Sequence, residues 1–156
     1  MDFKVFPLSE VILYDVASYF IDADTDYVFG GKVESIRQYP PILPENGIDC
    51  SGFMRYLLFR SAGIDICDGT YTQNIWLSKY GLKLTSADNN ALLDNHFRLN
   101  VHLPDSLDET GHIWLCQNAR TTECYGGHGV GHRDYNATLS SGHSLNDLAS
   151  RTYVIT

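Results

Sequence analysis

Residues 47–63 read GIDCSGFMRYLLFRSAG and place a cysteine at the start of a predicted helix. The apolar residues after Cys50 have the spacing of one buried helix face: Phe53, Met54, Leu57, Leu58 and Ala62. Gly63 is typical of the residue that follows a helix, because glycine readily adopts the left-handed conformation needed there. The sequence therefore predicts a helix over residues 50–62 with Cys50 in its first turn.

The position of Cys50 favours a reactive thiol. Unpaired backbone N–H groups and the positive end of the helix dipole both lie at a helix N-terminus. They stabilise a thiolate, and a nearby imidazolium helps to bring the thiol pKa from about 8.5 into the range of roughly 3.5–7.5. A nucleophile of this kind also needs a base within hydrogen-bond reach. For a cysteine taken alone, the alternative is a buried, inert thiol.

A predicted hairpin supplies a candidate base. Residues 111–127, GHIWLCQNARTTECYGG, are rich in aromatic and β-branched residues and predict two strands joined at residues 118–119. This turn makes His112 and Glu123 diagonal neighbours on one face of the hairpin. The carboxylate would hold the imidazole in one tautomer and favour its cation. With Cys50, these residues form a Cys-His-carboxylate set, a variant of the catalytic triad.

The chain has four cysteines: Cys50, Cys67, Cys116 and Cys124. None stands in a C-x-x-C pair, so the sequence provides no ligand frame for structural zinc. The predicted hairpin register pairs Gln117 with Arg120 and turns Cys116 and Cys124 to opposite faces. A disulfide between those two is therefore disfavoured, and we expect four free thiols.

The remaining predicted elements indicate an α+β fold. Ser9 is a suitable N-cap for a helix over residues 10–21. Its expected apolar stripe consists of Val11, Ile12, Val16, Tyr19 and Phe20. A second short helix is predicted from Thr70 to near Gly81, and the C-terminal RTYVIT, residues 151–156, reads as a last strand. Helices precede strands instead of alternating with them, which favours N-terminal helices packed on a C-terminal antiparallel sheet.

Composition narrows the class of protein. The 156 residues are 44% apolar and 19% charged, which indicates a globular chain, and we expect a single domain over residues 1–156. The formal net charge is -8 and the basic residues are scattered, so a nucleic acid is not expected as a partner. No apolar run approaches the roughly 18 residues that a membrane span requires. The N-terminal residues do not read as a signal peptide, and we expect no export signal in the chain.

Four segments resemble, in the same order, the NlpC-type cell-wall cysteine peptidases, papain-like enzymes that cut peptidoglycan stem peptides. YVFGG (27–31) is similar to the Y-x-[WY]-G-G of that family, and the DCSGF that begins at residue 49 matches its hallmark D-C-S-G-[LF]. Gln73 falls where the family carries a glutamine. GHIWL (111–115) matches the strand that opens with the catalytic histidine, and Glu123 lies on the next strand. The resemblance spans roughly residues 10 to 126 and implies a papain-like, NlpC-type fold.

The resemblance also implies roles for individual residues. Cys50 would be the nucleophile, His112 the general base and Glu123 the residue that orients the imidazole. Tyr27 matches a tyrosine close to the nucleophile that helps to stabilise the oxyanion. The backbone N–H of Cys50 would complete the oxyanion hole.

Two further positions, Asp49 and Ser51, match residues that in several family members contact the free amino end of the stem peptide. Taken alone, Asp49 is also readable as a simple helix cap. The sequence departs from the family pattern where a G-D-L-[VI]-F-F stretch is expected, because HFRLNVHLPDSLDETGH (96–112) stands there. We expect residues 85–110 to be loop with one short helix or strand at most.

The third position of the set is the least typical, because the family has His, Asn or Gln there more often than Glu. Asp134 and His128 are therefore alternatives to Glu123. His128 and His132 also have an H-x₃-H spacing that invites a metal interpretation. They lie in a glycine-rich segment poorly suited to fixed ligand geometry, so we expect a solvated loop or cleft wall. No metal or organic cofactor is expected.

The resulting functional prediction is a cysteine endopeptidase or amidase that cuts peptidoglycan stem peptides, by resemblance at the γ-D-glutamyl–diamino acid bond. Alternatives are acyl transfer or amide hydrolysis on a substrate outside the cell wall, and a cell-wall-binding module whose catalytic site has decayed. The lack of an export signal or wall-binding repeats suggests a delivered antibacterial toxin or a phage-associated lytic enzyme. Such a protein would be made in the cytoplasm and act in the periplasm or cell wall after delivery. A delivered toxin would also predict a tight immunity protein as partner.

Overall fold

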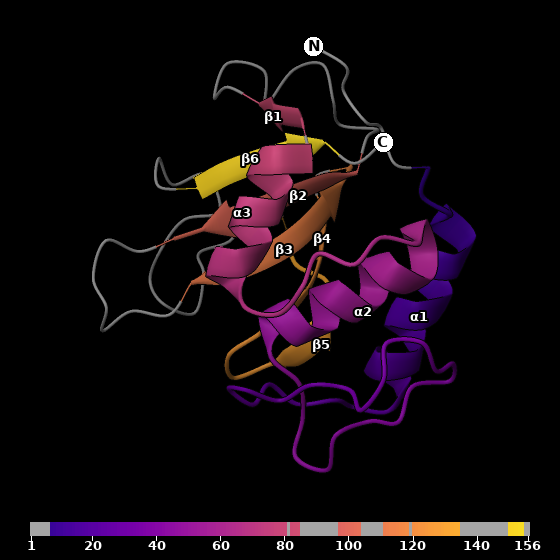
Figure 1. Cartoon of the computed structure of the whole chain (residues 1–156). Helices are drawn as coiled ribbons and strands as arrows, with labels where there is room; N and C mark the ends of the chain where they lie inside the picture. The colour runs from indigo at the N-terminus through magenta and orange to yellow at the C-terminus, as the bar shows by residue number, and fades with distance from the viewer. Residues whose placement is uncertain are drawn as a thin grey trace.

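The computed structural model describes residues 7–80, 82–84, 97–103, 111–118, 120–134 and 150–154. Three helices lie within them: α1 (Glu10–Asp22), α2 (Cys50–Ala62) and α3 (Thr70–Tyr80). The strands are β1 (Leu82–Leu84), β2 (Arg98–His102), β3 (His112–Gln117), β4 (Arg120–Tyr125), β5 (Gly129–Gly131) and β6 (Ser150–Val154). They form one antiparallel sheet in the order β1-β6-β2-β3-β4-β5 (Figure 1). The predicted α+β architecture, with N-terminal helices packed on a later antiparallel sheet, is confirmed.

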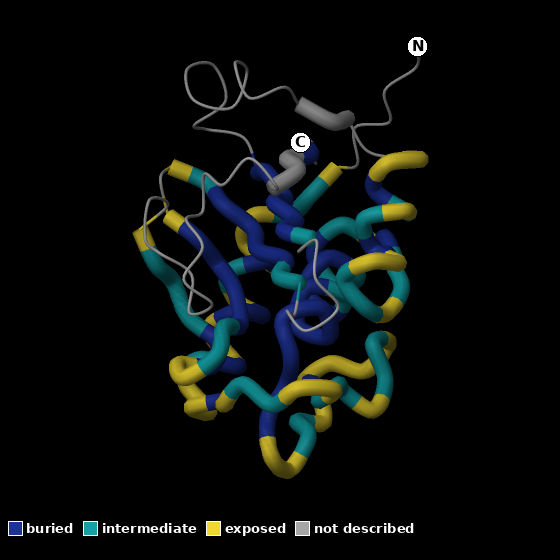
Figure 2. The backbone as a smooth tube through the Cα atoms, turned by 90° about the vertical axis from the view of Figure 1, so that its left-hand side faces the viewer, coloured by how far each residue is buried: buried dark blue, intermediate teal, exposed yellow. Residues whose placement is uncertain are grey.

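Helix α2 forms the centre of the core. It packs against α1 on one side and against β3 and β4 on the other, and Phe53 and Leu57 are fully buried. The Asp49 side chain caps the helix by accepting a hydrogen bond from the backbone N–H of Gly52 at 2.6 Å. Gly63 ends it in the left-handed conformation with φ of 70°. Figure 2 shows the buried backbone at the centre of the molecule and the exposed residues on the outer loops.

Helix α1 forms where the sequence predicts it, with Ser9 as N-cap, but its predicted stripe is partly wrong. The buried residues are Leu13, Val16, Ala17 and Phe20. Val11, Ile12 and Tyr19 are 73%, 44% and 37% exposed. The residues that are buried follow the i, i+3, i+4, i+7 spacing of one helix face. The predicted stripe instead includes consecutive residues, which point about 100° apart around the helix axis.

The β3–β4 hairpin has the predicted register. Cys116 lies opposite Thr121 and Gln117 opposite Arg120. Asn118 takes a positive φ of 54° in the turn, a conformation that asparagine tolerates better than most residues. Cys50, Cys67, Cys116 and Cys124 all lie in described parts of the chain, and all are free thiols.

The strand β2 lies inside the region expected to be mostly loop. It pairs with β3 on one side and β6 on the other, and all five of its residues are buried. The remainder of that region, residues 85–96 and 104–110, lies outside the described residues. The last strand is also as predicted, since β6 covers residues 150–154. None of the described helices has the length and apolarity that crossing a bilayer requires.

Two segments that match the family motifs run side by side next to α2. Tyr27 and Ile48 form a parallel bridge, and the backbone N–H of Asp49 donates to the Gly31 carbonyl at 2.9 Å. The approach is so close that a Cβ atom on Gly31 would collide with the Gly47 carbonyl. This pairing brings Tyr27 beside the start of α2 and so builds one wall of the site.

Candidate active site

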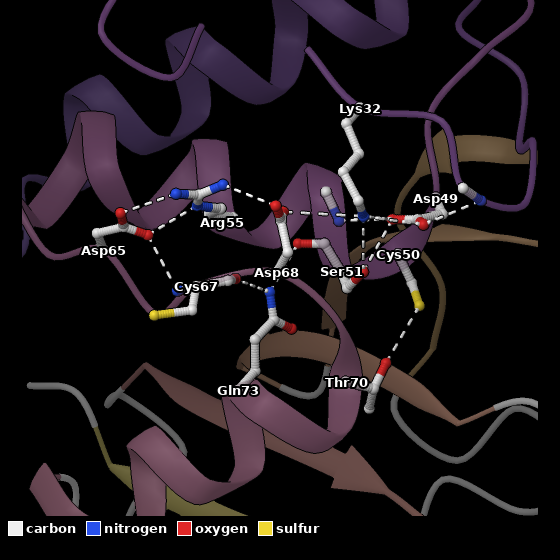
Figure 3. Close-up of polar contacts among 12 residues, drawn as sticks. Lys32, Asp49, Cys50, Ser51, Arg55, Asp65, Cys67, Asp68, Thr70 and Gln73 are labelled. Atoms are coloured by element: carbon white, nitrogen blue, oxygen red, sulfur yellow. Dashed lines mark hydrogen bonds and ion pairs between the residues drawn. The ribbon is translucent and has the colours of Figure 1, made fainter. Parts of the chain in front are cut away.

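Cys50 lies at the bottom of a cleft of about 480 Å³, between the 27–32 segment, the first turn of α2 and the start of α3. The residue is 4% exposed and lines this cleft. The sulfur is 4.0 Å from Thr70 Oγ1 (Figure 3) and 4.0 Å from the Gly111 carbonyl oxygen. Phe29 and Tyr71, two largely exposed aromatic residues, also line the cleft. A peptide carbonyl could reach the sulfur from this open side.

The structure brings together the three residues that the sequence predicts as a catalytic set. His112, the first residue of β3, interacts with the Cys50 thiol by hydrogen bonding and charge. Its Nε2 atom is 2.8 Å from Glu123 Oε1 on β4, which leaves Nδ1 as the nitrogen available to the sulfur. The imidazole stacks on Trp114, with ring centroids 5.3 Å apart. These contacts fix the orientation of the ring, while the catalytic roles of the three residues remain predictions.

Electrostatics favours the charged form of the Cys50–His112 pair. Burial alone would raise the pKa of the Cys50 thiol, but the hydrogen bond and charge of His112 outweigh burial and hold that pKa below its usual value. Burial acts to lower the pKa of His112, whereas Cys50 and Glu123 together raise it to about 9. Each group therefore stabilises the charged form of the other.

Glu123 is fully buried and is held by a second cation. Arg133 donates from Nη2 to Oε1 at 2.6 Å and from Nε to Oε2 at 3.2 Å. Burial would raise the pKa of Glu123, but His112 and Arg133 overcome this effect and lower it. The Arg133 guanidinium also lies 4.0 Å from the centroid of the Tyr125 ring. Glu123 therefore stays ionised beneath the imidazole.

The sequence interpretation missed Arg133. One signal could have found it: a carboxylate on a strand with apolar neighbours needs a cation if it is buried, and Arg133 follows only ten residues later. The sequence does not show, however, that Arg133 returns to Glu123. That return depends on β5, which lies between the two residues and pairs with β4.

The alternatives for the third position are less well placed. His128 is exposed and packs on Tyr125 with ring centroids 4.8 Å apart, and Asp134 is exposed in a bridge with Arg120. His132 Nδ1 is 2.8 Å from the Thr121 carbonyl oxygen, so the two histidines of the H-x₃-H spacing have separate surroundings. Within the described residues, no group of three or more His, Cys, Asp or Glu could hold a metal ion.

Tyr27 lines the cleft near the sulfur. Burial is the main cause that raises its pKa, to about 12, and the nearby Cys50 and Asp49 charges act in the same direction. The phenol is consequently protonated across the physiological range. It can donate a hydrogen bond to negative charge that develops on a substrate oxygen.

Asp49 and Ser51 lie beside Cys50, but a neighbouring lysine engages them. Asp49 accepts hydrogen bonds from the Gly52 N–H and from Ser51 Oγ at 2.6 and 2.9 Å. Lys32 Nζ lies 3.2 Å from Asp49 Oδ2 (Figure 3). The sequence interpretation did not single out Lys32, although it directly follows the YVFGG motif.

Gln73 connects two elements of the site. Its Nε2 donates to the carbonyl oxygens of Ser51 and Cys67, both at 2.8 Å. The first turns of α2 and α3 are thereby held at a fixed separation. This contact gives a structural reason for a glutamine at the position where the family carries one.

The chain matches the model of the NlpC/P60 family over residues 24–100. A solved structure described as similar to lipoprotein, NLP/P60 family, from Staphylococcus aureus subsp. aureus Mu50 has the same fold, with a TM-score of 0.57. It is 14% identical, and the match covers 97% of this chain and 44% of that chain. The chain is therefore similar to the NlpC/P60 family over residues 24–100 and shares the fold of that solved structure. A search of curated proteins found no match.

The family-model match agrees with the family resemblance of the sequence motifs. The matched region contains Tyr27, Asp49, Cys50 and Ser51 but ends before His112 and Glu123. This chain corresponds to less than half of the Staphylococcus aureus chain, so the comparison gives the fold and not an activity.

Proposed function

We propose that this protein hydrolyses an amide bond in peptidoglycan stem peptides through an acyl-enzyme on Cys50. The observation that supports the proposal best is the position of the Cys50 thiol, in an open cleft and paired with an imidazole that Glu123 orients. The resemblance of the DCSGF and GHIWL segments to cell-wall peptidases supports the substrate class. By the same resemblance, the favoured bond is γ-D-glutamyl–diamino acid.

Acylation begins with attack of the Cys50 thiolate on the amide carbonyl carbon. The C=O π electrons move to oxygen, and the backbone N–H of Cys50 and the Tyr27 hydroxyl donate hydrogen bonds to the oxyanion. The His112 imidazolium gives its proton to the leaving nitrogen as the C–N bond breaks. The products of this half-reaction are a free amine and a thioester on Cys50.

Deacylation reverses the role of His112. The imidazole, now neutral, takes a proton from water as the water oxygen attacks the thioester carbonyl. Collapse of the second tetrahedral intermediate breaks the C–S bond and regenerates the thiolate beside the imidazolium. Glu123 keeps its charge throughout and stabilises the imidazolium each time it forms.

Digestion of purified peptidoglycan tests the proposal. Wild type, Cys50→Ala and Cys67→Ala are incubated with sacculi, and the released muropeptides are identified by mass spectrometry. We expect new fragments from wild type and Cys67→Ala, none from Cys50→Ala, and fragment masses that identify the bond cut. Identical profiles for wild type and Cys50→Ala would reject hydrolysis and leave a binding module as the function.

A role as a delivered toxin or a phage-associated lytic enzyme remains a prediction. A protein encoded by a neighbouring gene that binds the cleft tightly and blocks digestion would support the toxin role. Without such a protein, the toxin role would have no support.

A further inference from the structure

Lys32 occupies the wall of the cleft next to Cys50. Its ammonium lies 3.2 and 3.4 Å from the two carboxylate oxygens of Asp49 and 3.5 Å from Ser51 Oγ. The Lys32 side chain is 34% exposed, whereas that of Asp49 is 9% exposed. The ammonium therefore covers a buried carboxylate on the side that faces the cleft (Figure 3).

The contacts already made by Asp49 leave little room for another cation. Its Oδ1 accepts from the Gly52 N–H and from Ser51 Oγ, and its Oδ2 accepts from the Gly30 N–H at 3.1 Å. With Lys32 added, the lone-pair sites of the carboxylate are essentially filled. An ammonium group on a substrate could reach Asp49 only by displacing Lys32.

Lys32 is also held from its other side. Asp68 lies 3.8 Å from the Lys32 ammonium, and its second oxygen is 3.0 Å from Arg55 on α2. Arg55 in turn makes a two-point contact with Asp65 at 2.7 and 2.9 Å. Figure 3 shows this alternation of carboxylates and cations from Asp65 to Asp49. Because the network is anchored on α2, it orients Lys32 towards Asp49.

We propose that Lys32 determines specificity, so that the cleft binds N-acylated peptides and rejects a free amino terminus beside Cys50. This inference rests on the proposed function. It differs from the amine-binding role that the family resemblance implies for Asp49 and Ser51, because here the chain itself supplies the ammonium. A substrate ammonium at this wall would meet a like charge a few ångströms away, whereas an amide at the same place would not.

Kinetics with a matched pair of substrates tests the inference. Two synthetic stem peptides of one sequence, one with a free amine and one N-acetylated, are compared by kcat/KM in wild type, Lys32→Met, Lys32→Arg and Lys79→Met. We expect wild type to prefer the acetylated peptide by roughly tenfold or more, the penalty of one close like charge. Lys32→Met should reduce or reverse this ratio, whereas Lys32→Arg and the exposed control Lys79→Met should keep it. A wild-type preference for the free amine, or a ratio that Lys32→Met leaves unchanged, would overturn the inference.

Binding separates a failure of this inference from a failure of the proposed function. Calorimetry of both peptides with Cys50→Ala reports recognition even if the protein cuts neither peptide. Tighter binding of the acetylated peptide, lost in Cys50→Ala/Lys32→Met, would support the role of Lys32 independently of hydrolysis. Tighter binding of the free amine, or no binding of either peptide, would contradict it.

Discussion

At the residue scale, the candidate site is a row of alternating charges. The Cys50 thiol interacts with the His112 imidazole, the imidazole contacts the Glu123 carboxylate, and the carboxylate contacts the Arg133 guanidinium. A buried ion is costly unless paired, so each member depends on its neighbours to keep its charge. The row therefore behaves as a unit, and removing one member changes the pKa of the others.

We predict that the Cys50 thiol is alkylated at a lower pH than an ordinary thiol. Its pKa is lowered from the ordinary value of a cysteine thiol, so its thiolate fraction at a given pH exceeds that of an unperturbed cysteine. In His112→Ala, burial acts without the imidazolium, so the midpoint should move above that value. Iodoacetamide labelling across pH, followed by peptide mapping, measures both midpoints. Cys116, buried and with its pKa raised to about 11, is an internal comparison that should label at higher pH than Cys50.

We predict that Glu123→Gln lowers the upper pH limit of activity. The Glu123 charge helps to raise the pKa of His112, so the neutral amide should lower that pKa from about 9 and move the alkaline limb to lower pH. Turnover at neutral pH should also fall by about 10²-fold, the lower end of typical general acid–base contributions. The measurement is kcat against pH, with the exposed Glu34→Gln as the matched control. Near-normal turnover with an unshifted limb would move the orienting role to another residue.

At the element scale, the boundaries of α2 and the hairpin register were predictable because their signals are local. Asp49 and Gly63 are the cap residues on either side of that helix, and the two-residue turn sets the hairpin register. The buried face of α1 and the position of β2 depend instead on what packs against them. The RLNVH sequence of β2 alternates polar and apolar residues, which suggests a half-exposed strand, yet both of its faces are covered. The local sequence does not indicate which elements pack against the two faces of β2.

We predict that Gly31→Ala destabilises the fold and reduces activity, whereas Gly131→Ala does neither. A Cβ on Gly31 would collide with the Gly47 carbonyl, and relieving that overlap must separate the Tyr27 segment from α2. A Cβ on Gly131 has no heavy atom among its described surroundings within 4 Å. The expected loss of unfolding free energy is about 1–3 kcal/mol for the first variant and within about 0.5 kcal/mol for the second. Urea midpoints and sacculus digestion compare them, and equal midpoints would refute the close-approach argument.

At the scale of the whole molecule, the candidate site joins two halves of the chain. The family model covers the half that carries Cys50, and the base and its partners lie on strands beyond it. Sequence motifs could identify His112 and Glu123 because the hairpin is local. The family motifs did not point to Arg133 or Lys32, since each pairing with a buried carboxylate depends on how separate segments of the chain meet. Arg133 and Lys32, which neutralise buried carboxylates at the site, were thus found only in the structure.

Contacts between the helices and the later strands support our proposal that residues 1–156 form one domain. This proposal predicts a single unfolding transition. Tyr153 on β6 donates to Asn74 on α3 at 2.8 Å, and Cys124 on β4 donates to the Ile48 carbonyl at 3.1 Å, so the helices and sheet share a core. The two tryptophans report on different halves, Trp76 on α3 and Trp114 on β3.

Trp114→Phe and Trp76→Phe each leave one fluorescent reporter, and each variant is unfolded in urea with fluorescence and far-UV circular dichroism recorded together. If the halves form one cooperative unit, the two signals coincide within each variant even though the substitutions lower the midpoint. Comparing signals within one variant removes the effect of the substitution itself. A Trp76 transition that precedes the loss of ellipticity would instead mean that the α3 region opens alone. The wall of the cleft that Thr70 and Tyr71 form would then unfold separately from the elements that carry Cys50 and His112.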